Sequence, residues 1–405
     1  MVPNGWSIES LGNVTEKVGS GVTPRGGSNS YKLSGIPLIR SQNVLWGKLD
    51  LSDVAYIDEL QHNKMKGSFV YKNDVLLNIT GASIGRVAVS DIDEANVNQH
   101  VCIIRSDDLD SGYLKSFLLS FQGQKQIEQC QAGGNRQGLN FEQIKSFKIP
   151  FPHLPEQQKI AKILSTWDNA ISTTERLIEN STQQKKALMQ QLLTGKKRLF
   201  DDEERRFKGE WEEYPVGEIC QSIVPGRNKP KKFDGHIPWV TTPEFQGRYI
   251  PSKLQKNYIS QSVIDECGAK LVPKGAVVIA AVGDLGLTAM ASEIIVLNQQ
   301  LHAFVCGENV YNEYLFYWLS YQKPYMESIA SKTTIQYMNK KNCESIPVKL
   351  PTLEEQQKIA SVLTNADKEI ELLEQQLADL QQEKKALMQV LLTGKRRVLV
   401  DGEVA

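Results

Sequence analysis

The segment KKALMQQLLTGKKR at Lys185–Arg198 returns almost unchanged as KKALMQVLLTGKRR at Lys384–Arg397. A second shared segment, EQQKIA, lies at Glu156–Ala161 and again at Glu355–Ala360, at the same offset. Between these anchors the two copies align without a gap, and such self-similarity at a fixed offset is the signature of an internal repeat. The sequence therefore predicts two equivalent halves in one chain.

Apolar residues in both copies recur at alternating steps of three and four over more than four heptads. This 3.5-residue period is typical of a coiled coil. Thr174 and Ser181 make the middle of the first seam more polar, and Lys185 and Lys384 each occupy one seam position. The apolar residues of the predicted seam are Ile160, Leu164, Trp167, Ile171, Ile178, Leu188 and Leu192 in the first copy, and Ile359, Leu363, Ile370, Leu373, Leu377, Leu380, Leu387 and Leu391 in the second.

Start and stop signals flank both predicted helices. Thr352 and Glu355 have the spacing of a capping box, and Pro155 suits a first helical turn. Gly195 and Gly394 suit the position just after a helix, where a left-handed backbone is common. Because two matched seams occur in one chain, we expect two helices of about 55 Å that pair with each other in antiparallel orientation.

The blocks that precede the two helices predict mixed α/β domains. Weak echoes link them, such as GIPLIR (Gly35–Arg40) with HIPWVT (His236–Thr241), and NQHV (Asn98–Val101) with NQQL (Asn298–Leu301). Helices are expected at Tyr113–Phe121 and Tyr314–Tyr321, and the expected strands include Val75–Thr80, Val101–Arg105, Ala276–Val282 and Glu293–Leu297. The expected division is a domain over residues 1–154, a helix over 155–198, a linker and second domain over 199–350, and a helix over 351–405.

Composition excludes several classes of protein. The 405 residues hold 47 basic and 47 acidic side chains, so the net charge is zero, which argues against tight nucleic-acid binding without a partner. No run of 18 apolar residues and no signal peptide are found, so we expect neither a membrane span nor export. Six scattered cysteines, with no CxxC spacing, favour reduced thiols in the cytoplasm and no zinc site.

Catalytic motifs are absent from the sequence. Gly195-Lys196 lacks the first glycine of a phosphate-binding loop, since position 190 is Gln190. We find no dinucleotide fingerprint, no adenine methylation motif, no nuclease signature and no metal-like spacing among the histidines. A chain of this length without such a constellation is expected to bind rather than to catalyse.

The repeated helical motifs carry a resemblance to a known family. LPEQQKIAKIL with KKALMQQLLTGKKRL, followed by EEQQKIASVL with KKALMQVLLTGKRRV, resembles the specificity subunit of type I restriction-modification systems. The resemblance covers essentially the whole chain. Weaker motifs occur in the expected order in the first domain, namely GVTP, IPLIR, TGASIG and NQH.

The resemblance implies a DNA-binding subunit without catalysis of its own. Each target recognition domain would read one half of a bipartite, asymmetric DNA target, while the paired helices hold the domains apart and dock modification subunits, of which we expect two. Restriction subunits would complete the nuclease. The S-adenosylmethionine, ATP and magnesium that such a complex needs would belong to those partners, with no cofactor or metal in this chain.

Polar and basic loops are the natural reading surface of each domain, because base edges are read by Arg, Lys, Asn, Gln, Ser and Thr. The candidates in the first domain are Arg25, Ser28, Asn29, Tyr31, Arg40, Gln42, Asn43, Asn135, Arg136 and Gln137. The candidates in the second domain are Arg227, Asn228, Lys229, Lys231, Lys232, Thr241, Thr242, Thr333, Thr334 and Gln336.

Charge is distributed unequally between the two domains. Residues 1–154 hold 15 basic and 15 acidic side chains, whereas residues 205–350 carry three extra positive charges. We therefore expect the second domain to contribute more of the non-specific affinity for phosphate, and so the steeper salt dependence.

Two other readings stay open at this point. A structural coiled-coil adaptor with protein-binding end domains would carry hydrophobic patches in place of polar loops. A DNA methyltransferase fused to its own recognition domain would need a cofactor motif, which the sequence lacks. The identity of the bases that each domain recognises and the length of the gap between half-sites do not follow from the residues.

Overall fold

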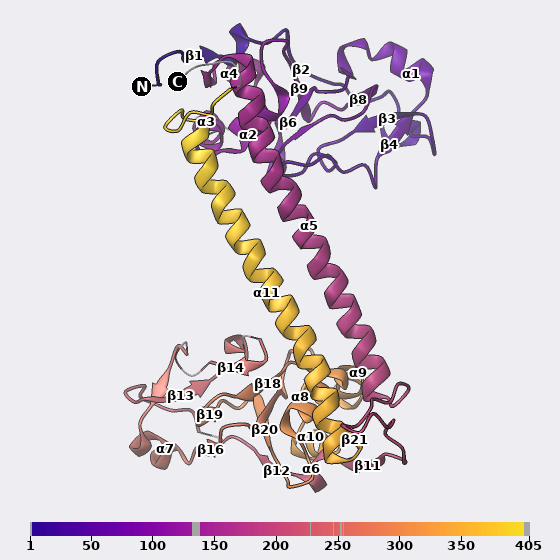
Figure 1. The fold of residues 1–405 in the computed structure, drawn as a ribbon, viewed down its shortest axis with the longest axis vertical. Coiled ribbons are helices and arrows are strands. Elements are labelled where there is room, and N and C mark those ends of the chain that lie inside the picture. Colours follow the sequence, from indigo (N-terminus) through magenta and orange to yellow (C-terminus); the bar gives the residue numbers. More distant parts are fainter. Residues whose placement is uncertain are drawn as a thin grey trace. The chain divides into compact units, whose positions relative to one another are not determined.

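The computed structural model describes residues 2–131, 138–226, 228–245, 247–251, 253 and 255–400. It divides into two compact units (Figure 1). The first unit comprises residues 1–176 with 374–405, and the second comprises residues 177–373. Each unit therefore holds one α/β domain together with parts of two long helices.

The domain of the first unit contains two four-stranded sheets and a two-stranded ribbon. The main sheet has the order β2 (Lys17–Ser20), β9 (Val101–Arg105), β6 (Val75–Asn78), β7 (Val87–Val89) and is antiparallel. The second sheet has the order β4 (Ala55–Ile57), β3 (Ile36–Ile39), β8 (Ala95–Val97), β5 (Phe69–Val70), with β3 and β8 parallel. The ribbon pairs β1 (Ser7–Ser10) with β10 (Lys148–Phe151), and the short helices are α1 (Glu59–Lys64), α2 (Ser111–Leu119), α3 (Phe121–Gln131) and α4 (Phe141–Lys145).

The domain of the second unit repeats this plan and adds one strand. Its main sheet has the order β12 (Cys220–Ile223), β20 (Leu301–Cys306), β17 (Val277–Ala280), β18 (Thr288–Ala291), β14 (Tyr249–Ile250). Its second sheet has the order β15 (Tyr258–Ile259), β13 (Ile237–Val240), β19 (Ile295–Leu297), β16 (Leu271–Val272). The ribbon pairs β11 (Glu212–Pro215) with β21 (Pro347–Leu350), and the short helices are α6 (Val216–Ile219), α7 (Gln261–Cys267), α8 (Asn312–Tyr321), α9 (Lys323–Ile329) and α10 (Lys340–Glu344).

These elements follow from local patterns in the sequence. The strand β9 (Val101–Arg105) forms with the predicted bounds, and its apolar run Val101–Ile104 is buried. The helix expected from Tyr113 begins two residues earlier, because Asp110 caps it and accepts a hydrogen bond of 2.9 Å from the Tyr113 amide. The predicted fold class, two mixed α/β domains with paired long helices in an internal repeat, is confirmed.

The long helices are α5 (Leu154–Leu193) and α11 (Leu353–Leu391), and they run antiparallel in both units. In the first unit, Trp167 Nε1 donates to Glu383 Oε2 at 3.2 Å. In the second unit, Ser181 Oγ donates to Glu369 Oε1 at 3.2 Å. Within the first unit, Glu156 pairs with Arg397 and Asp168 pairs with Lys384, so the partner moves backward along the chain as the contact moves forward along α5, which defines the antiparallel orientation.

Every position of the two seams is buried or half-buried, including the polar ones. Thr174, on the first seam, is only 4% exposed and donates its hydroxyl proton to the Ala170 carbonyl, so it replaces an apolar residue without an unpaired group. Two leucines off the middle of the seam are exposed instead, Leu177 at 46% and Leu372 at 71%. The seam residues near the helix ends enter the domain cores, where Ile160 packs with the α2 residues of the first unit and Leu363 with the α8 residues of the second.

A glycine with a left-handed backbone follows the C-terminal end of each long helix. Gly195 has a φ of +69° and Gly394 a φ of +70°, the left-handed region that favours glycine. At the start of α11 only half of the expected capping box forms. Thr352 Oγ1 accepts from the Glu355 amide at 3.3 Å, but the Glu355 carboxylate turns to Arg198 rather than back to the cap.

The chain just beyond each helix binds the first turn of the other helix through an arginine, and we call each such arginine–glutamate pair a clasp. In the second unit, Arg198 donates two hydrogen bonds of 2.7 Å to Glu355. In the first unit, Arg397 donates hydrogen bonds of 2.6 and 2.8 Å to Glu156. Both glutamates are buried. Two basic residues that follow the helices therefore serve contacts within the chain.

Several absences hold for the described part of the chain. No helix there is long and apolar enough to cross a membrane. No group of three His, Cys, Asp or Glu side chains among those residues could hold a metal ion. The six cysteines are free thiols, and burial raises the pKa of Cys102 and that of Cys343 to about 12.

Candidate nucleic-acid interface

Polar loops meet at one edge of the main sheet in each unit, and we call this the loop edge. In the first unit, β2 and β6 both run antiparallel to β9, with Ser20 opposite Cys102 and Asn78 opposite Val101. The loops that follow β2 and β6 therefore lie beside the turn that precedes β9. The loop after β3 lies at the same edge, because the Asn78 side chain donates to the Ser41 carbonyl at 2.8 Å.

Hydrogen bonds join these loops into one surface. Thr23, in the loop after β2, donates to the side-chain oxygen of Gln99, whose amide approaches His100 Nε2 at 2.9 Å. Thr80, in the loop after β6, lies 2.6 Å from His100 Nδ1 and pairs as a β-bridge with Gly138. The amide of Gln99 can only donate, so Nε2 accepts and the ring proton lies on Nδ1. The four side chains form a continuous polar chain across three loops.

The second unit closes its loop edge in the same way with different residues. Gln299 donates to the carbonyls of Gly226 and Asn228 at 2.9 and 3.4 Å, and so holds the loop after β12. The Gly283 amide donates to the Gln336 carbonyl at 2.9 Å, which brings the loop 331–337 to the same place. Gln99 and Gln299 are thus equivalent in position, and each is exposed and ties the first loop of its domain to the turn before the central strand.

The described candidates of the first domain belong to the loops that follow β2 and β3, which both reach this edge. Tyr31 and Arg40 are half-buried, with the guanidinium 5.7 Å from the ring centroid. Arg40 also donates to the Asp53 carbonyl at 3.0 Å, and Gln42 donates to the Asp53 carboxylate at 2.8 Å. The exposed candidates are Arg25, Ser28, Asn29 and Gln42.

Asn43 does not have the exposed position that its predicted role requires. Its side chain is only 2% exposed, and its amide donates to the Asp50 and Asp53 carbonyls at 3.0 and 3.2 Å. Its oxygen accepts from the Arg40 amide at 2.9 Å. Buried side chains with their hydrogen bonds satisfied inside the protein cannot offer them to a base. Asn43 therefore shapes the loop after β3, and the prediction that it meets DNA is wrong.

Four candidates lie outside the described residues, namely Asn135, Arg136, Gln137 and Arg227.

The candidates of the second domain divide into exposed and structural side chains. Asn228, Lys229, Lys231 and Lys232 are exposed in the loop after β12, and Asn228, Lys229 and Lys231 line a groove of about 460 Å³. Thr333, Thr334 and Gln336 are exposed in the loop 331–337.

Thr241 departs from the expected role, because its hydroxyl donates to Glu244 Oε2 at 2.8 Å, within a capping turn. Thr242 is half-buried, and its hydroxyl lies 3.5 Å from Gln300 Oε1 in the turn before β20.

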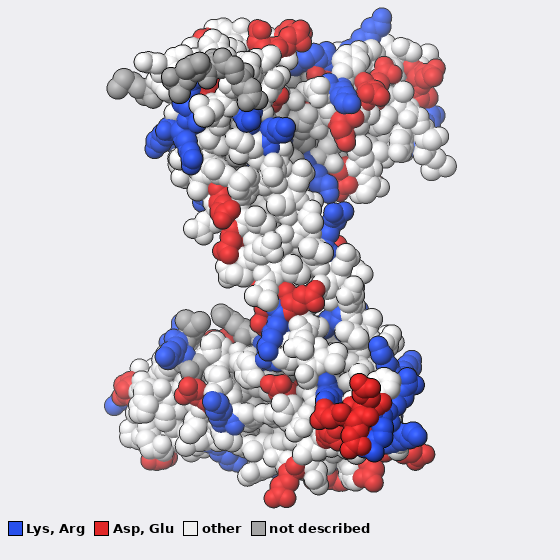
Figure 2. Space-filling model, viewed as in Figure 1, with Lys and Arg blue, Asp and Glu red and all other residues white. Residues whose placement is uncertain are grey.

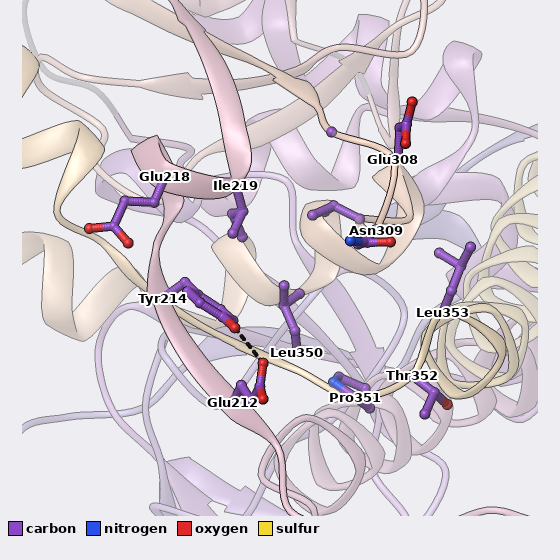
Figure 3. A pocket seen from close by; sticks show the side chains of 12 residues that line it. Glu212, Tyr214, Glu218, Ile219, Glu308, Asn309, Leu350, Pro351, Thr352 and Leu353 are labelled. Atoms are coloured by element: carbon purple, nitrogen blue, oxygen red, sulfur yellow. Dashed lines mark hydrogen bonds between the residues drawn. The ribbon is translucent and has the colours of Figure 1, made fainter.

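The opposite edge of the second unit's main sheet is acidic. In the second unit it holds a pocket of about 450 Å³ lined by Glu212, Glu218 and Glu308, where Tyr214 donates its hydroxyl proton to Glu212 (Figure 3). That hydrogen bond raises the pKa of Tyr214. The pocket of about 430 Å³ at the corresponding end of the first unit is lined by Asp107 and Asp110 but also by Lys72 and Arg105. The acidic pocket of the second unit repels phosphates, whereas the exposed lysines of its loop edge attract them.

Basic residues form no continuous field on the face drawn in Figure 2, where Lys and Arg are interspersed with Asp and Glu. This pattern agrees with the zero net charge of the chain. Affinity for DNA at the loop edges would therefore depend on local contacts more than on a broad basic patch.

Several residues of the loop edge were not among the candidates from the sequence. Thr23, Thr80, Gln99 and His100 in the first unit all belong to it, and so does Gln299 in the second. The Asn-Gln pair that precedes the central strand in both halves was the available signal. It was recognised as a repeated motif, but its place beside the other loops depends on strand pairing that the sequence does not show.

Comparisons with known proteins agree on one family. The profile of the Type I restriction modification DNA specificity domain matches residues 3–181 and again 208–382. A putative type I restriction enzyme specificity subunit from Methanocaldococcus jannaschii is 29% identical over 98% of this chain and 95% of its own length. The specificity subunit of an Escherichia coli type I enzyme, EcoR124I/EcoR124II, is 25% identical over 57% of this chain and 58% of its own length.

Solved structures share the fold. The S subunit of a type I restriction-modification system from M. genitalium superposes with a TM-score of 0.61 at 16% identity, over 96% of both chains. A chain from the structure of an assembled type I system gives a TM-score of 0.60 at 19% identity, over 98% of this chain and all of that one. Specificity subunits act in complexes whose catalytic activities reside in separate subunits. With two matched domains spanning most of its length, the chain belongs to the family of type I restriction-modification specificity subunits and is a non-catalytic subunit that recognises DNA targets.

Proposed function

We propose that each α/β domain reads one half of a bipartite DNA target through its loop edge. The observation that carries the proposal is the recurrence of one loop arrangement in both units with different side chains. Gln99 contacts a threonine hydroxyl in the first unit, whereas Gln299 contacts two backbone carbonyls in the second. Because base edges are read by side chains, equal frames with unequal side chains imply two half-sites of different sequence.

The paired helices are the spacer in this proposal. Helices α5 and α11 are uninterrupted over 40 and 39 residues, which corresponds to about 60 Å each. Half-sites read by a two-fold arrangement of domains lie about one turn of DNA apart, ~34 Å. Helices of this length are sufficient to set such a separation once the width of the domains is allowed for.

The remaining members of the complex follow from the same proposal. The exposed outer faces of the helices, with Leu177 and Leu372 among their exposed residues, would dock two modification subunits. Those subunits would bring S-adenosylmethionine, and restriction subunits would bring ATP and magnesium. The protein would act in the cytoplasm, where it meets both the DNA and these partners.

Adenine methylation mapped across a genome tests the proposal directly. The chain is co-expressed with its modification subunits, and the methylated sites are read at base resolution. We expect one split motif with a fixed gap. Methylation by this chain alone would indicate a fused enzyme, and methylation without any sequence dependence would indicate an adaptor, and either result would overturn the proposal.

A symmetric deletion tests the spacer separately. Removing Thr174–Asn180 and Leu373–Asp379 takes seven residues from the middle of each helix, which shortens each by ~10 Å. We expect both half-sites to stay the same while the gap changes by about three base pairs, at ~3.4 Å per base pair. A motif with an unchanged gap would show that the helices do not set it.

Lysines of the loop after β12 test the DNA contact itself. Replacing Lys231 and Lys232 by glutamine should reduce the slope of log affinity against log salt by up to about 2, because each phosphate contact contributes ~0.9. Both half-sites should remain the same, since phosphate contacts carry no sequence information. Lys159→Gln, on α5, and Lys208→Gln, in the segment before β11, replace exposed lysines outside the loops of the loop edge and provide the control.

A further inference from the structure

A charged side chain interrupts the seam of the paired helices once in each unit. In the first unit, Lys384 of α11 occupies a seam position and forms an ion pair with Asp168 of α5. The two side chains are 20% and 30% exposed. A half-buried ion pair costs desolvation energy that its own attraction only partly returns, so its usual value is to fix one arrangement among several.

The same carboxylate also binds the recognition domain. Lys115, on helix α2, places its Nζ 3.2 Å from Asp168 Oδ2, while Lys384 binds the other oxygen. Lys115 is only 15% exposed. Asp168 thus joins three elements, the two long helices and the helix that covers the main sheet of the domain. We call this cluster the first node.

The second unit contains a second node built on Asp367 of α11. Lys185 of α5 forms an ion pair with Asp367 Oδ1, and the two are 25% and 15% exposed. The Tyr317 hydroxyl, from helix α8, donates to Asp367 Oδ2 at 2.5 Å. The Lys185 ammonium lies 5.7 Å from the centroid of the same ring. Here too one carboxylate joins both long helices to the domain.

The two nodes occupy equivalent positions of the repeat. Asp168 and Asp367 are separated by 199 residues, the offset between Lys185 and Lys384. The donor from the domain is not equivalent, because Lys115 aligns with Phe316 and Tyr317 aligns with Ser116. Two unrelated side chains, from different positions of their helices, therefore reach the same carboxylate. The contact recurs although the residue that makes it has changed.

Other registers of the helices would lose these contacts. A slip of one heptad would place Leu377 or Leu391 opposite Asp168, and Ile178 or Leu192 opposite Asp367. Asp168 would then keep only Lys115, and Asp367 only the Tyr317 hydroxyl, each half-buried beside leucine or isoleucine without the cation of the other long helix. Such an arrangement is unfavourable, because each carboxylate stays desolvated while one of its compensating contacts is lost.

We propose that Asp168 and Asp367 are positioning residues that fix the orientation of each recognition domain on the paired helices and thereby set which gap between half-sites the protein accepts. The inference deepens the proposed function and rests on it. Neither residue touches DNA in this account. Each acts through Lys115 or Tyr317 on the domain that does.

The test perturbs one node at a time and measures tolerance of the gap. Tyr317→Phe removes one hydroxyl, and Asp168→Asn removes the charge that Lys115 and Lys384 share. The full complex with modification subunits methylates DNA fragments that carry both half-sites at the preferred gap or at gaps one base pair shorter and longer. Tyr317→Phe and Asp168→Asn, each alone, should lower discrimination between preferred and altered gaps about tenfold, because each orienting contact is worth ~1.4 kcal/mol. Lys115→Arg should retain discrimination, since it keeps a charged donor.

Controls separate positioning from simple loss of stability. Tyr317→Phe keeps the ring that fills the core. The control variant, Glu179→Gln, changes an exposed carboxylate of α5, the helix that carries Asp168, at a position without a contact to the domain. We expect Glu179→Gln to discriminate between gaps as well as the wild type does. The double variant with Lys115→Met and Asp168→Asn should discriminate no worse than Asp168→Asn alone. An equal loss of methylation at every gap, or unchanged discrimination, would overturn the inference. Failure of the proposed function is distinct, since the wild type would then show no split motif at all.

Discussion

The clasps of the two units use the same pair of residues in different surroundings. In the second unit, Glu355 is 1% exposed and Arg198 is 20% exposed, so the pair lies largely inside the protein. In the first unit, Glu156 is 4% exposed but Arg397 is 40% exposed. Glu156 also accepts a hydrogen bond of 2.9 Å from Trp6 Nε1. The carboxylate of the first clasp therefore has a third donor that the second clasp lacks.

The tryptophan beside each clasp also differs between the units in its hydrogen bonds. Arg397 lies over the Trp6 ring at 5.8 Å, and Arg198 lies over the Trp211 ring at 5.5 Å. The Trp211 indole nitrogen has no hydrogen-bond partner among the described residues, whereas that of Trp6 is satisfied. Equal sequence motifs at the helices thus do not produce equal energetics, because the partners come from segments that differ between the halves.

Loss of the arginine is the change that should distinguish the clasps most strongly. Arg198→Ala leaves the buried Glu355 carboxylate without the arginine that pairs with it and should cost about 3 kcal/mol. Arg397→Ala should cost about 1–2 kcal/mol, because Trp6 still donates to Glu156 and solvent reaches the site. Urea unfolding gives the sizes, and hydrogen exchange of the first turns of α5 and α11 shows where protection is lost.

Arg205→Ala is the matched control for this pair. Arg205 is 68% exposed and pairs with Asp201 on the surface, so its loss should change stability by less than about 0.5 kcal/mol. If Arg397→Ala proved as costly as Arg198→Ala, the third donor from Trp6 would have no energetic importance.

Acidic pH should destabilise the two units unequally, because they differ at one position of the central strand. His302 of β20 and Cys102 of β9 occupy the equivalent place, since Ile279 pairs with His302 as Leu77 pairs with Cys102. Burial lowers the pKa of His302 from 6.5 to about 4, whereas burial raises the pKa of Cys102 to about 12. The cysteine therefore stays neutral at any mildly acidic pH.

The sign of the effect follows from which state binds the proton first. The unfolded chain protonates His302 near pH 6.5 and the folded chain only near pH 4, so the stabilisation is complete above pH 6.5 and is lost as the pH falls toward 4. At pH 5 the loss amounts to about 2 kcal/mol. Unfolding of the full chain at pH 7 and pH 5 should show this loss, and His302→Gln should remove most of it. Equal acid sensitivity in the variant would refute this role for His302.

The helices were largely predictable from the sequence because their signal is local. Leu363 and Leu391 lie in one heptad pattern, and a glycine in a left-handed turn ends each helix where the repeat does. The strand Val101–Arg105 was equally clear, because an apolar run of that length at the centre of a sheet is buried on both faces.

The loop edge was less predictable because its parts are far apart in the chain. Thr23 meets Gln99 only because β2 pairs with β9, and no local pattern encodes that pairing. Asn43 is the opposite case, a residue that the sequence nominated but that lies buried. A polar residue in a loop after a strand is typical both of a base contact and of a turn that satisfies its own backbone. Which of the two it is depends on burial, and burial is a property of the folded domain.

A pair of buried tyrosines provides the smallest and most closely matched comparison. Tyr113 donates its hydroxyl proton to the Pro150 carbonyl at 2.7 Å, and Tyr314 donates to the Lys349 carbonyl at 2.6 Å. Both rings are fully buried between a short helix and the ribbon. Tyr113→Phe and Tyr314→Phe should each cost about 1 kcal/mol, because each leaves one carbonyl without its donor and keeps the ring in place. Urea unfolding of the two variants measures both values. The clasps and the strand position have different partners in the two units, whereas this hydrogen bond has the same kind of partner in both. Unequal losses of stability in Tyr113→Phe and Tyr314→Phe would therefore mean that the two domains are less similar in energy than they are in geometry.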